Sequence, residues 1–444
     1  MPKTIKPALY VCSACGAALE SWSGRCPRCG EWNTLELVNR QSSHLSSVKL
    51  KLNSLNASFE KDDNRFCCGI PAVDKLLGGG IVAGSVTLLS GDPGIGKSTL
   101  LLQIAGESSK TKTVLYVSGE ESVHQIALRA KRLGLSSNRL SITSTSSTNQ
   151  IASEILSGRH EIVIVDSIQT ITLDEVGSSA GSIAQVTNSS SLLTQAAKQS
   201  NCAVIIVGHV TKDGNVAGPK LLEHIVDVVM SLEGDLSGGL KLLRVSKNRF
   251  GPTNETAIFE MFATGLHSVS NPSAMLLAER KVTDGSVVLA AMEGSRPLLV
   301  EVQALVNPTS YGFPKRAASG FDLSRLNLLL AMIERRTSLK LSDKDVFLNL
   351  VGGLKINEPA ADLAVVMAVA SAARAKKLNH NAVVFGEVGL SGEIRSVPFI
   401  SKRLAEAKQL GFNFAIGPKP LKDKPSDFLI PSTDVKSALN KFLS

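Results

Sequence analysis

Residues 85–108, "SVTLLSGDPGIGKSTLLLQIAGES", indicate the fold class of this chain. An apolar, β-branched run leads into a sequence that fits GxxxxGK[ST], and a helix-like pattern begins at once behind it. In such a loop the glycines let backbone N–H groups surround phosphate oxygens, and the N-terminus of the helix favours negative charge. The stretch therefore predicts a strand, a loop that binds the phosphates of ATP or GTP, and a helix.

Each residue of the loop has an expected contact with the nucleotide or its metal. Lys97 is expected to reach the β- and γ-phosphates, and Ser98 to hold Mg²⁺ through its hydroxyl. The nucleotide-binding residues expected from the motif are Gly91, Asp92, Pro93, Gly94, Ile95, Gly96, Lys97, Ser98 and Thr99.

Apolar runs like the one before the loop recur along the chain, separated by helix-like segments. Three of them span residues 113–118, 161–167 and 202–210. This alternation predicts an α/β domain with a mainly parallel sheet whose strands are buried on both faces. Three later runs follow one another too closely for helical crossovers, and we expect them to be antiparallel strands at one edge. They span residues 224–235, 240–248 and 256–262.

Polar residues at the ends of these runs are the candidates for hydrolysis. Asp166 ends a run that we expect to lie beside the strand of the phosphate loop, where it would hold Mg²⁺ through its water shell. A simple strand cap is the alternative. Glu120 or Glu121 would orient or deprotonate the attacking water, and the other would cap a helix. His209 would sense the γ-phosphate, unless the backbone satisfies its ring.

Four cysteines near the N-terminus form two CxxC pairs, Cys12/Cys15 and Cys26/Cys29. Two such knuckles aim four thiolates at one point, which predicts a tetrahedral, structural Zn²⁺ site with no open position for water. The alternative, a redox dithiol, needs only one CxxC and a βαβ context that is absent here.

Bulk composition limits the class of protein. A chain of 444 residues is too long for one core, and its formal net charge of +9 suits a polyanionic partner such as nucleic acid or an anionic membrane surface. A basic housekeeping enzyme is equally compatible with the charge. The longest apolar stretch, residues 363–373, is far shorter than the roughly 20 residues that span a bilayer. With no signal-peptide pattern at the N-terminus, we expect a cytoplasmic protein.

The pentapeptide "KNRFG" ends a predicted strand. It consists of Lys247, Asn248, Arg249, Phe250 and Gly251. Because side chains alternate across a strand, the lysine and the arginine should point to one side and the asparagine to the other. Two cations on the same side of a strand are expected to bind an anion. This anion could be a DNA phosphate, a surface carboxylate, or the γ-phosphate of a nucleotide bound to a neighbouring subunit.

The motifs "GDPGIGKST", "SGEES", "IVDSIQT", "GHVTKDG" and "KNRFG" follow in this order behind the four cysteines. In this the chain resembles the bacterial RadA (Sms) family of DNA repair proteins, over nearly its whole length. The resemblance implies a RecA-type core, with Glu120 activating water and His209 as sensor. It also implies a DNA-dependent ATPase that forms a hexameric ring, moves along single-stranded DNA and promotes branch migration of branched DNA alongside RecA. Similar Lys-x-Arg-x-Gly motifs in ring helicases reach across subunits, which favours the third role for Lys247 and Arg249.

Two segments resemble the loops that hold single-stranded DNA in RecA-like proteins. The first, residues 211–224, contains Lys212 and Lys220 and is rich in glycine, which suits a mobile loop that tracks phosphates. The second, residues 173–185, is acidic and apolar and is the weaker match.

The last part of the chain resembles the proteolytic domain of Lon, in "INEPAADLAVVMAVAS" and "GEVGLSGEIRSVPFISKRLAEAKQLG". Ala360 stands where a nucleophilic serine is needed, Ser401 stands where the lysine base is needed, and Lys402 is offset by one. Without an activatable hydroxyl, covalent catalysis fails, so we expect a proteolytically inactive α+β domain of the ribosomal S5 domain 2 type. Seven basic residues could give this domain a face for duplex DNA. They are Lys315, Arg316, Arg325, Lys376, Lys377, Lys402 and Arg403.

The expected organisation follows. It is a zinc ribbon over residues 1–38, a Ser- and Asn-rich linker over 39–65, a RecA-like ATPase over 66–268 and a Lon-like domain over 269–444. Two alternatives to the DNA motor stay open: a RecA-fold switch ATPase of the KaiC kind, without translocation, and an ATP-dependent protease.

Overall fold

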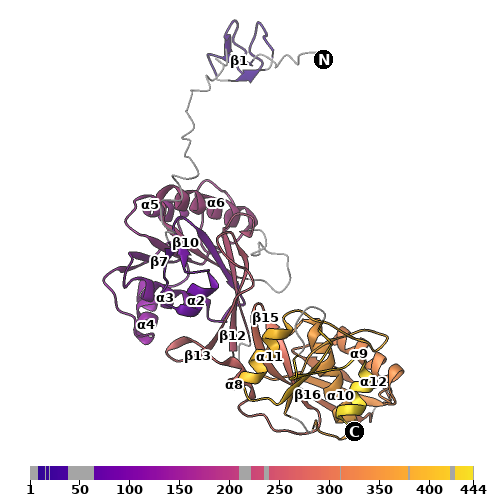
Figure 1. Cartoon of the computed structure of the whole chain (residues 1–444). Helices are drawn as coiled ribbons and strands as arrows, with labels where there is room; N and C mark the ends of the chain where they lie inside the picture. Colours follow the sequence, from indigo (N-terminus) through magenta and orange to yellow (C-terminus); the bar gives the residue numbers. More distant parts are fainter. Residues whose placement is uncertain are drawn as a thin grey trace. The chain divides into compact units, whose positions relative to one another are not determined.

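The computed structural model describes residues 9–38 except 16 and 20, and residues 65–209, 222–234, 240–310, 312–378, 381–420 and 426–443. The chain divides into two compact units, Met1–Asp62 and Asp63–Ser444 (Figure 1). Among the described helices, none combines the length and the apolar character that crossing a membrane requires.

The first unit is a small antiparallel sheet. Its strands, in the order β2-β1-β3, are β1 (Leu9–Cys12), β2 (Ala18–Leu19) and β3 (Leu35–Val38). Both knuckles close by backbone hydrogen bonds, in which Cys12 N donates to Ala17 O at 2.9 Å and Cys26 N donates to Glu31 O at 2.8 Å. The buried core of this unit includes the cysteines Cys12 and Cys26, so its packing is centred on the thiols themselves.

The second unit contains a nine-stranded sheet in the order β14-β13-β12-β11-β6-β10-β9-β7-β8. Six neighbouring strands run parallel: β6 (Val86–Gly91), β7 (Val114–Ser118), β8 (Leu140–Ser144), β9 (Ile162–Asp166), β10 (Ala203–His209) and β11 (Val228–Gly234). Three antiparallel strands extend one edge: β12 (Leu240–Asn248), β13 (Thr256–Phe262) and β14 (Gly265–Ser268). A separate two-stranded antiparallel sheet, β4 (Arg65–Phe66) and β5 (Ile81–Val82), precedes β6 in the chain, with a helix between its two strands. The predicted α/β class with a mainly parallel sheet is confirmed.

Helices cover both faces of this sheet (Figure 1). On one face the core includes residues of α2 (Pro71–Leu76), α3 (Lys97–Ser108) and α4 (Val123–Arg132). On the other it includes residues of α5 (Thr148–Leu156) and α6 (Ile183–Ser200). Serine hydroxyls cap three of the helix starts by accepting a backbone N–H from the first turn. These serines are Ser122, Ser147 and Ser182.

Two predictions about strand arrangement are wrong. First, β11 runs parallel to β6 instead of antiparallel, because the chain between His209 and Val228 is long enough to return to the other end of the sheet. Second, β9 with Asp166 does not lie beside β6, since β10 lies between them. Spatial order in a parallel sheet is not chain order, so a sequence pattern alone does not fix the neighbours.

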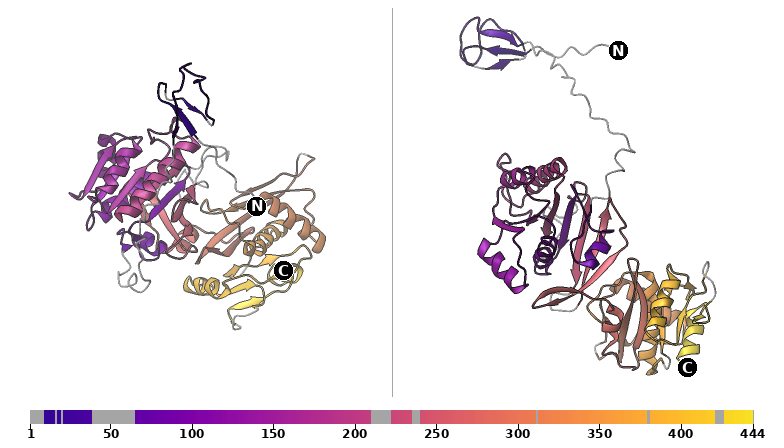
Figure 2. Two further views of the ribbon diagram at one scale, coloured as in Figure 1. Left: turned by 90° about the horizontal axis from the view of Figure 1, so that it is seen from above. Right: turned by 60° about the vertical axis from the view of Figure 1, so that its left-hand side comes forward.

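The C-terminal residues build a second sheet with its own helices, coloured orange to yellow in Figure 2. Its strands, in the order β17-β18-β16-β15-β19-β22-β23, are β15 (Ser286–Glu293), β16 (Arg296–Pro308), β17 (Arg316–Ser319), β18 (Lys344–Leu350), β19 (Ala382–Val384), β22 (Phe414–Gly417) and β23 (Leu429–Pro431). A separate hairpin consists of β20 (Glu387–Val388) and β21 (Ile394–Arg395). The helices are α8 (Pro272–Leu277), α9 (Leu323–Arg336), α10 (Asp362–Arg374), α11 (Ile400–Gln409) and α12 (Val435–Phe442). The first ten residues of α10 are all buried, which explains its nearly unbroken apolar sequence.

The two sheets of the second unit share a core. Leu240 and Leu242 of β12 and Ile258 of β13 belong to the same buried cluster as the C-terminal strands. The antiparallel extension of the first sheet is therefore the structural link to the C-terminal part of the chain.

Candidate nucleotide and zinc sites

The phosphate loop connects the end of β6 at Gly91 to the start of α3 at Lys97. Gly91 has φ +152° and Gly96 has φ +114°, values that other residues rarely adopt. A Cβ on Gly91 would lie 2.4 Å from Leu232 O, and one on Gly96 would lie 2.5 Å from Met261 Cε. The loop conformation thus requires glycine at Gly91 for backbone torsion and for space, and at Gly96 for backbone torsion, since the methionine methyl group can move.

The Lys97 side chain is folded into this loop and is 4% exposed. Its Nζ donates to the carbonyl oxygens of Gly91 at 2.8 Å and Asp92 at 2.9 Å. Burial lowers the pKa of Lys97, and the nearby carboxylates of Asp166, Asp92 and Glu120 oppose that shift. The ammonium is therefore held by neutral carbonyls in the loop, where a phosphate offers it a stronger, charged partner.

Asp166 ends β9, and its carboxylate is oriented by a residue that the sequence analysis missed. The Tyr116 hydroxyl donates to Asp166 Oδ2 at 2.6 Å. Burial first, and then the Asp166 charge, raise the pKa of Tyr116 well above its usual value, so the phenol stays a neutral donor. A tyrosine inside the aliphatic run "VLYVS" was the available signal, because a buried phenol needs a partner.

The two glutamates after β7 have different surroundings. Glu121 forms an ion pair with Arg129 of α4, whereas Glu120 Oε1 accepts the Ser167 hydroxyl at 2.6 Å. Ser122 caps α4, so the expected capping role for one of the glutamates is wrong. The contact with Ser167 puts Glu120 next to the end of β9, where the Asp166 carboxylate lies.

The sheet register brings these groups together where the parallel strands end, which is here called the carboxyl edge of the sheet. Ser118 at the end of β7 is opposite Asp166, and His209 at the end of β10 is opposite Gly91. The carboxyl ends of parallel strands are where such folds bind ligands. The His209 side chain lies outside the described atoms, and Lys212 and Lys220 lie outside the described residues.

The KNRFG pentapeptide lies where the parallel strands begin, which is here called the amino edge of the sheet. Asn248 is opposite Val228, and Val228 is opposite Thr87 near the start of β6. The strand from Val86 to the loop at Gly91 spans about 17 Å at roughly 3.3 Å per residue. The pentapeptide is therefore remote from the phosphate loop of its own chain.

The two cations of the pentapeptide turn toward one segment, as the strand alternation predicts. Lys247 Nζ donates to the carbonyl oxygens of Glu223 and, at 2.7 Å, Val226. Arg249 Nη1 lies 3.0 Å from Asp227 Oδ1, and the arginine side chain is 52% exposed. Asp227 is itself buried, and its Oδ2 accepts Val86 N at 3.1 Å.

The rest of the pentapeptide forms a tight turn. Asn248 Oδ1 accepts Phe250 N at 2.9 Å, and Phe250 O accepts Arg65 Nη2 at 2.8 Å. A Cβ on Gly251 would lie 3.0 Å from Asn248 Nδ2, so glycine keeps the turn closed. Asparagine and glycine here shape the backbone, and the cations are left for recognition.

The four predicted zinc ligands converge. The Sγ atoms of Cys12, Cys15, Cys26 and Cys29 all lie within 4.8 Å of one another, as tetrahedral thiolate coordination requires. Cys12 Sγ lies 3.1 Å from Thr34 Oγ1, and this contact is the main cause that lowers the pKa of Cys12 to about 6. The set fits Zn²⁺, with every coordination position filled by sulfur.

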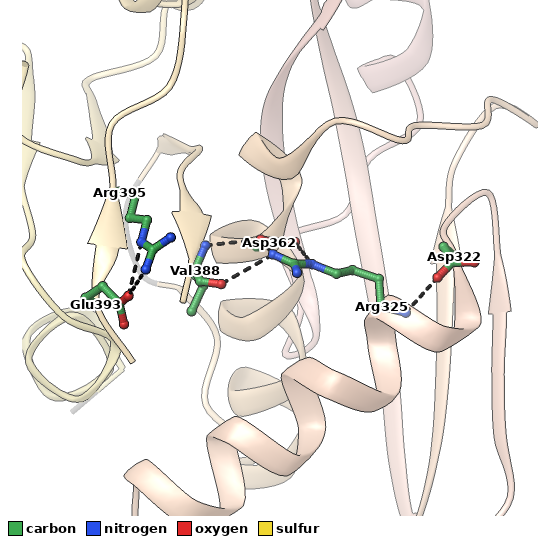
Figure 3. Close-up of polar contacts among 6 residues, drawn as sticks. All are labelled: Asp322, Arg325, Asp362, Val388, Glu393 and Arg395. Carbon is green, nitrogen blue, oxygen red and sulfur yellow. Dashed lines mark hydrogen bonds and ion pairs between the residues drawn. The ribbon is translucent and has the colours of Figure 1, made fainter. Parts of the chain in front are cut away.

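The Lon-like turn has no nucleophile. Ala360 is buried in the short 3₁₀ turn η1 (Pro359–Ala361) ahead of α10. Asp362, the residue after this turn, is held by hydrogen bonds. Arg325 Nε donates to its Oδ1 at 3.0 Å, and Val388 N donates to its Oδ2 at 3.1 Å (Figure 3). Lys402 Nζ donates to Ser295 O at 3.1 Å instead of facing a hydroxyl. At this described turn Ala360 offers no hydroxyl for covalent catalysis.

One proposed DNA-facing residue is misplaced. Arg403 is 0% exposed and pairs with Glu358, with Nη1–Oε1 at 3.0 Å and Nη2–Oε2 at 2.7 Å. It belongs to the buried stripe of α11, with Ile400, Leu404 and Ala407. The spacing i, i+3, i+4, i+7 places Arg403 on the buried face of the helix, but its charge led to the prediction of an exposed position.

Family models match three parts of the chain. One described as "AAA domain" matches residues 53–215, one described as "Rubredoxin metal binding domain" matches residues 10–36, and one described as "Subunit ChlI of Mg-chelatase" matches residues 311–420. The first match and the phosphate loop make this an ATPase that uses ATP with Mg²⁺. The second match and the four thiols make the N-terminal unit a Zn²⁺ ribbon.

Similar proteins cover nearly the whole chain. A DNA repair protein RadA of Aquifex aeolicus (strain VF5) is 47% identical over 414 residues, which are 93% of this chain and 93% of that protein. A DNA repair protein RadA of Escherichia coli (strain K12) is 44% identical over 431 residues, 94% of each. A solved structure, the crystal structure of the RadB recombinase, matches 46% of this chain and 100% of its own at 24% identity and a TM-score of 0.37. The resemblance drawn from the motifs is confirmed, and the chain belongs to the family of RadA DNA repair proteins.

Proposed function

We propose that this chain is a DNA-dependent ATPase of recombinational DNA repair that works as a hexameric ring on single-stranded DNA. It would promote branch migration of recombination intermediates alongside RecA, in the cytoplasm. The observation that carries the proposal is the separation of two halves of a nucleotide site. The phosphate loop lies at one edge of the nine-stranded sheet, and the KNRFG cations lie at the other.

Within one chain, the carboxyl edge supplies the binding half. Lys97 would exchange its two carbonyl partners for β- and γ-phosphate oxygens, because a charge-assisted hydrogen bond is stronger than a neutral one. Ser98 and Asp166 would hold Mg²⁺, which neutralises phosphate charge when bound. Glu120, oriented by the Ser167 hydroxyl, would position the attacking water, and His209 would sense the γ-phosphate.

The neighbouring chain would supply the other half. Arg249 is half-exposed and bound by a single ion pair to Asp227, so a γ-phosphate can compete for its remaining donors. A rigid guanidinium that meets charge developing on the transferred phosphoryl group is typically worth about 10³–10⁵ in rate. Because no subunit can apply Arg249 to its own loop, hydrolysis would require the assembled ring.

DNA contacts would come from two regions. Lys212 and Lys220 belong to the segment after β10 that resembles a DNA-binding loop. In the C-terminal domain the basic residues that are not buried are the remaining candidates for duplex contact. They are Lys315, Arg316, Arg325, Lys376, Lys377 and Lys402. We also propose the domain limits expected from sequence, which are 1–38, 66–268 and 269–444. The linker 39–65 joins the first domain to the second.

The test is steady-state ATP turnover of the purified protein with and without single-stranded DNA, over a series of salt concentrations. A DNA motor predicts stimulation that declines as salt rises, because phosphate contacts release counterions. Turnover that is the same with and without DNA at every salt concentration would contradict the motor and favour a switch ATPase. If DNA does stimulate turnover, branch-migration substrates would distinguish translocation from simple binding.

A further inference from the structure

The chain contains two tryptophans, and both lie exposed on the zinc ribbon. The Trp22 side chain is 57% exposed and that of Trp32 is 68% exposed. An indole is the largest apolar side chain, and two of them in water on so small a unit add nothing to its core. Exposed apolar surface of this kind marks a binding site more often than chance.

The ribbon brings the two indoles together from positions ten residues apart in sequence. Asn33 N donates to Gly24 O at 2.9 Å, and Arg25 and Trp32 form a β-bridge. As a result, an atom of each indole lies 3.8 Å from the point that a Cβ on Gly24 would occupy. The indoles therefore flank the same glycine on the same part of the surface.

A cation is fixed beside them. The Arg25 guanidinium carbon lies 5.8 Å from the centre of the Trp32 ring, and its Nε donates to Gly30 O at 2.7 Å. Arg28, in the next knuckle, is exposed. Between residues 22 and 33 the charged residues other than the two cysteine ligands are these two arginines and Glu31, and both arginines are exposed.

The composition of the surface selects the ligand class. Among ribbon residues whose side chains the structure describes, the exposed large hydrophobic groups are the two indoles. A groove for a protein helix or strand would offer aliphatic contacts, whereas nucleobases stack on flat π-faces and on arginine. The nearby cations suit the phosphates that link successive bases.

We propose that Trp22, Trp32 and Arg25 form an indole platform on which bases of single-stranded DNA stack, with Arg28 contacting the backbone. The proposal rests on DNA as the substrate of the ATPase and adds a second, ATP-independent contact with the same strand. The zinc site has the role of holding the two knuckles, and thereby the two indoles, in register.

The composition also provides the assay. Since the platform contains every tryptophan of the chain, the indole fluorescence of the full-length zinc-loaded protein reports on this surface alone. Titration with an oligothymidylate should quench that fluorescence, with the same midpoint as binding of a labelled oligothymidylate measured by anisotropy. Replacing Trp22→Ala or Trp32→Ala should weaken binding about 5- to 100-fold, the range for one lost base–aromatic stack. Trp32→Phe, which keeps a π-face, should recover much of the loss.

Controls separate the platform from folding and from the motor. Zinc content and basal turnover without DNA should be unchanged in each tryptophan variant, and Leu156→Ala, which removes exposed apolar surface on α5, should leave DNA affinity unchanged. Unchanged DNA affinity in both tryptophan variants would overturn the platform, while DNA-stimulated turnover would keep the proposed function intact. Loss of DNA stimulation in the wild-type protein would instead overturn the proposed function. Quenching by purified RecA and not by DNA would overturn the platform in favour of a protein-binding surface.

Discussion

The two edges of the nine-stranded sheet each hold a lysine in a similar way and in opposite surroundings. The ammonium groups of Lys97 and Lys247 both donate to two backbone carbonyl oxygens of their own chain. Lys97 is nearly inaccessible, with carboxylates nearby, at the mouth of a glycine loop. Lys247 is followed two positions later by the exposed Arg249, and the phosphate loop lies at the other edge.

The difference shows what each edge can do alone. At the carboxyl edge the chain provides cation, hydroxyl, carboxylates and turned backbone, which together make a cradle for a nucleotide. At the amino edge it provides cations without a cradle, so their anion has to come from another molecule or from Asp227. The following substitutions test this contrast through ATP binding, ATP turnover, stability and metal content.

The largest effect is expected for Lys97→Ala. Loss of a charged donor that makes several phosphate contacts should weaken ATP binding at least about 100-fold, since each charged hydrogen bond contributes about 1.5–3 kcal/mol. Turnover should become undetectable. Calorimetric titration with ATP measures the affinity, and Lys110→Ala, which breaks an exposed ion pair with Glu107, is the control. Retained affinity would remove the assignment of the loop.

A loss of about 10³-fold in turnover is expected for Arg249→Ala, with ATP affinity nearly unchanged, because the arginine acts on the transition state of a neighbour. Mixing this variant with Glu120→Gln should restore part of the activity, since some interfaces then contain both groups. Arg159→Ala, on an exposed ion pair of α5, is the control.

The mixing experiment has its own check. Arg249→Ala mixed with a chain that carries both substitutions should stay inactive, because no subunit then supplies the arginine. If the first mixture is as inactive as the second, action across subunits is disproved and the ion pair with Asp227 becomes the role of Arg249.

A smaller effect is expected at Glu293, which anchors the strand that carries KNRFG. Its Oε2 lies 2.7 Å from Arg244 Nη2 of β12. Burial raises the pKa of Glu293 to about 7, with Arg244 opposing the shift and Glu358 and Glu233 adding to it. Since the folded state binds the proton more tightly than the unfolded state, this contribution to stability is present below pH 4.5 and is lost as pH rises through about 7.

Glu293→Gln should therefore flatten the pH dependence of unfolding. Between pH 5 and pH 8 the wild-type protein should lose on the order of 1–3 kcal/mol more stability than the variant. Urea unfolding at both pH values measures the difference, with exposed Glu279→Gln as the control. Parallel pH profiles for wild type and Glu293→Gln would show that Glu293 is not the responsible group.

The smallest effect on turnover is expected for Cys26→Ser. It should release zinc, since three thiolates leave the tetrahedral site incomplete. Basal turnover and unfolding of the larger unit should be unchanged, because neither sheet edge contains a ribbon residue. Metal analysis after gel filtration measures the first result, and a full complement of zinc would refute the ligand set.

The sequence predicted best the sites whose residues lie close together in the chain. The phosphate loop and the two CxxC knuckles each combine their chemistry and their turn residues within a few positions, so local pattern was sufficient. Groups joined only by topology were missed: the neighbour of β9, the direction of β11, and the contacts of Asp166 with Tyr116 and of Glu120 with Ser167. Arg403 failed for another reason, since a buried ion pair looks like surface charge until its partner Glu358 is known.

The carboxylate of Asp227 physically connects the two edges. It holds Arg249 with one oxygen and, with the other, the amide of Val86 with which β6 begins. A phosphate that draws Arg249 away leaves the buried carboxylate with Lys198, whose Nζ lies 3.9 Å from Oδ1, as its remaining cation among the described residues, which is unfavourable unless the surroundings adjust. The adjustment would start at the first residue of the strand that ends in the phosphate loop. In a ring, the state of one nucleotide would thus be coupled to the strand of the subunit that lends the arginine, and by linkage that subunit's nucleotide would bias the arginine in return.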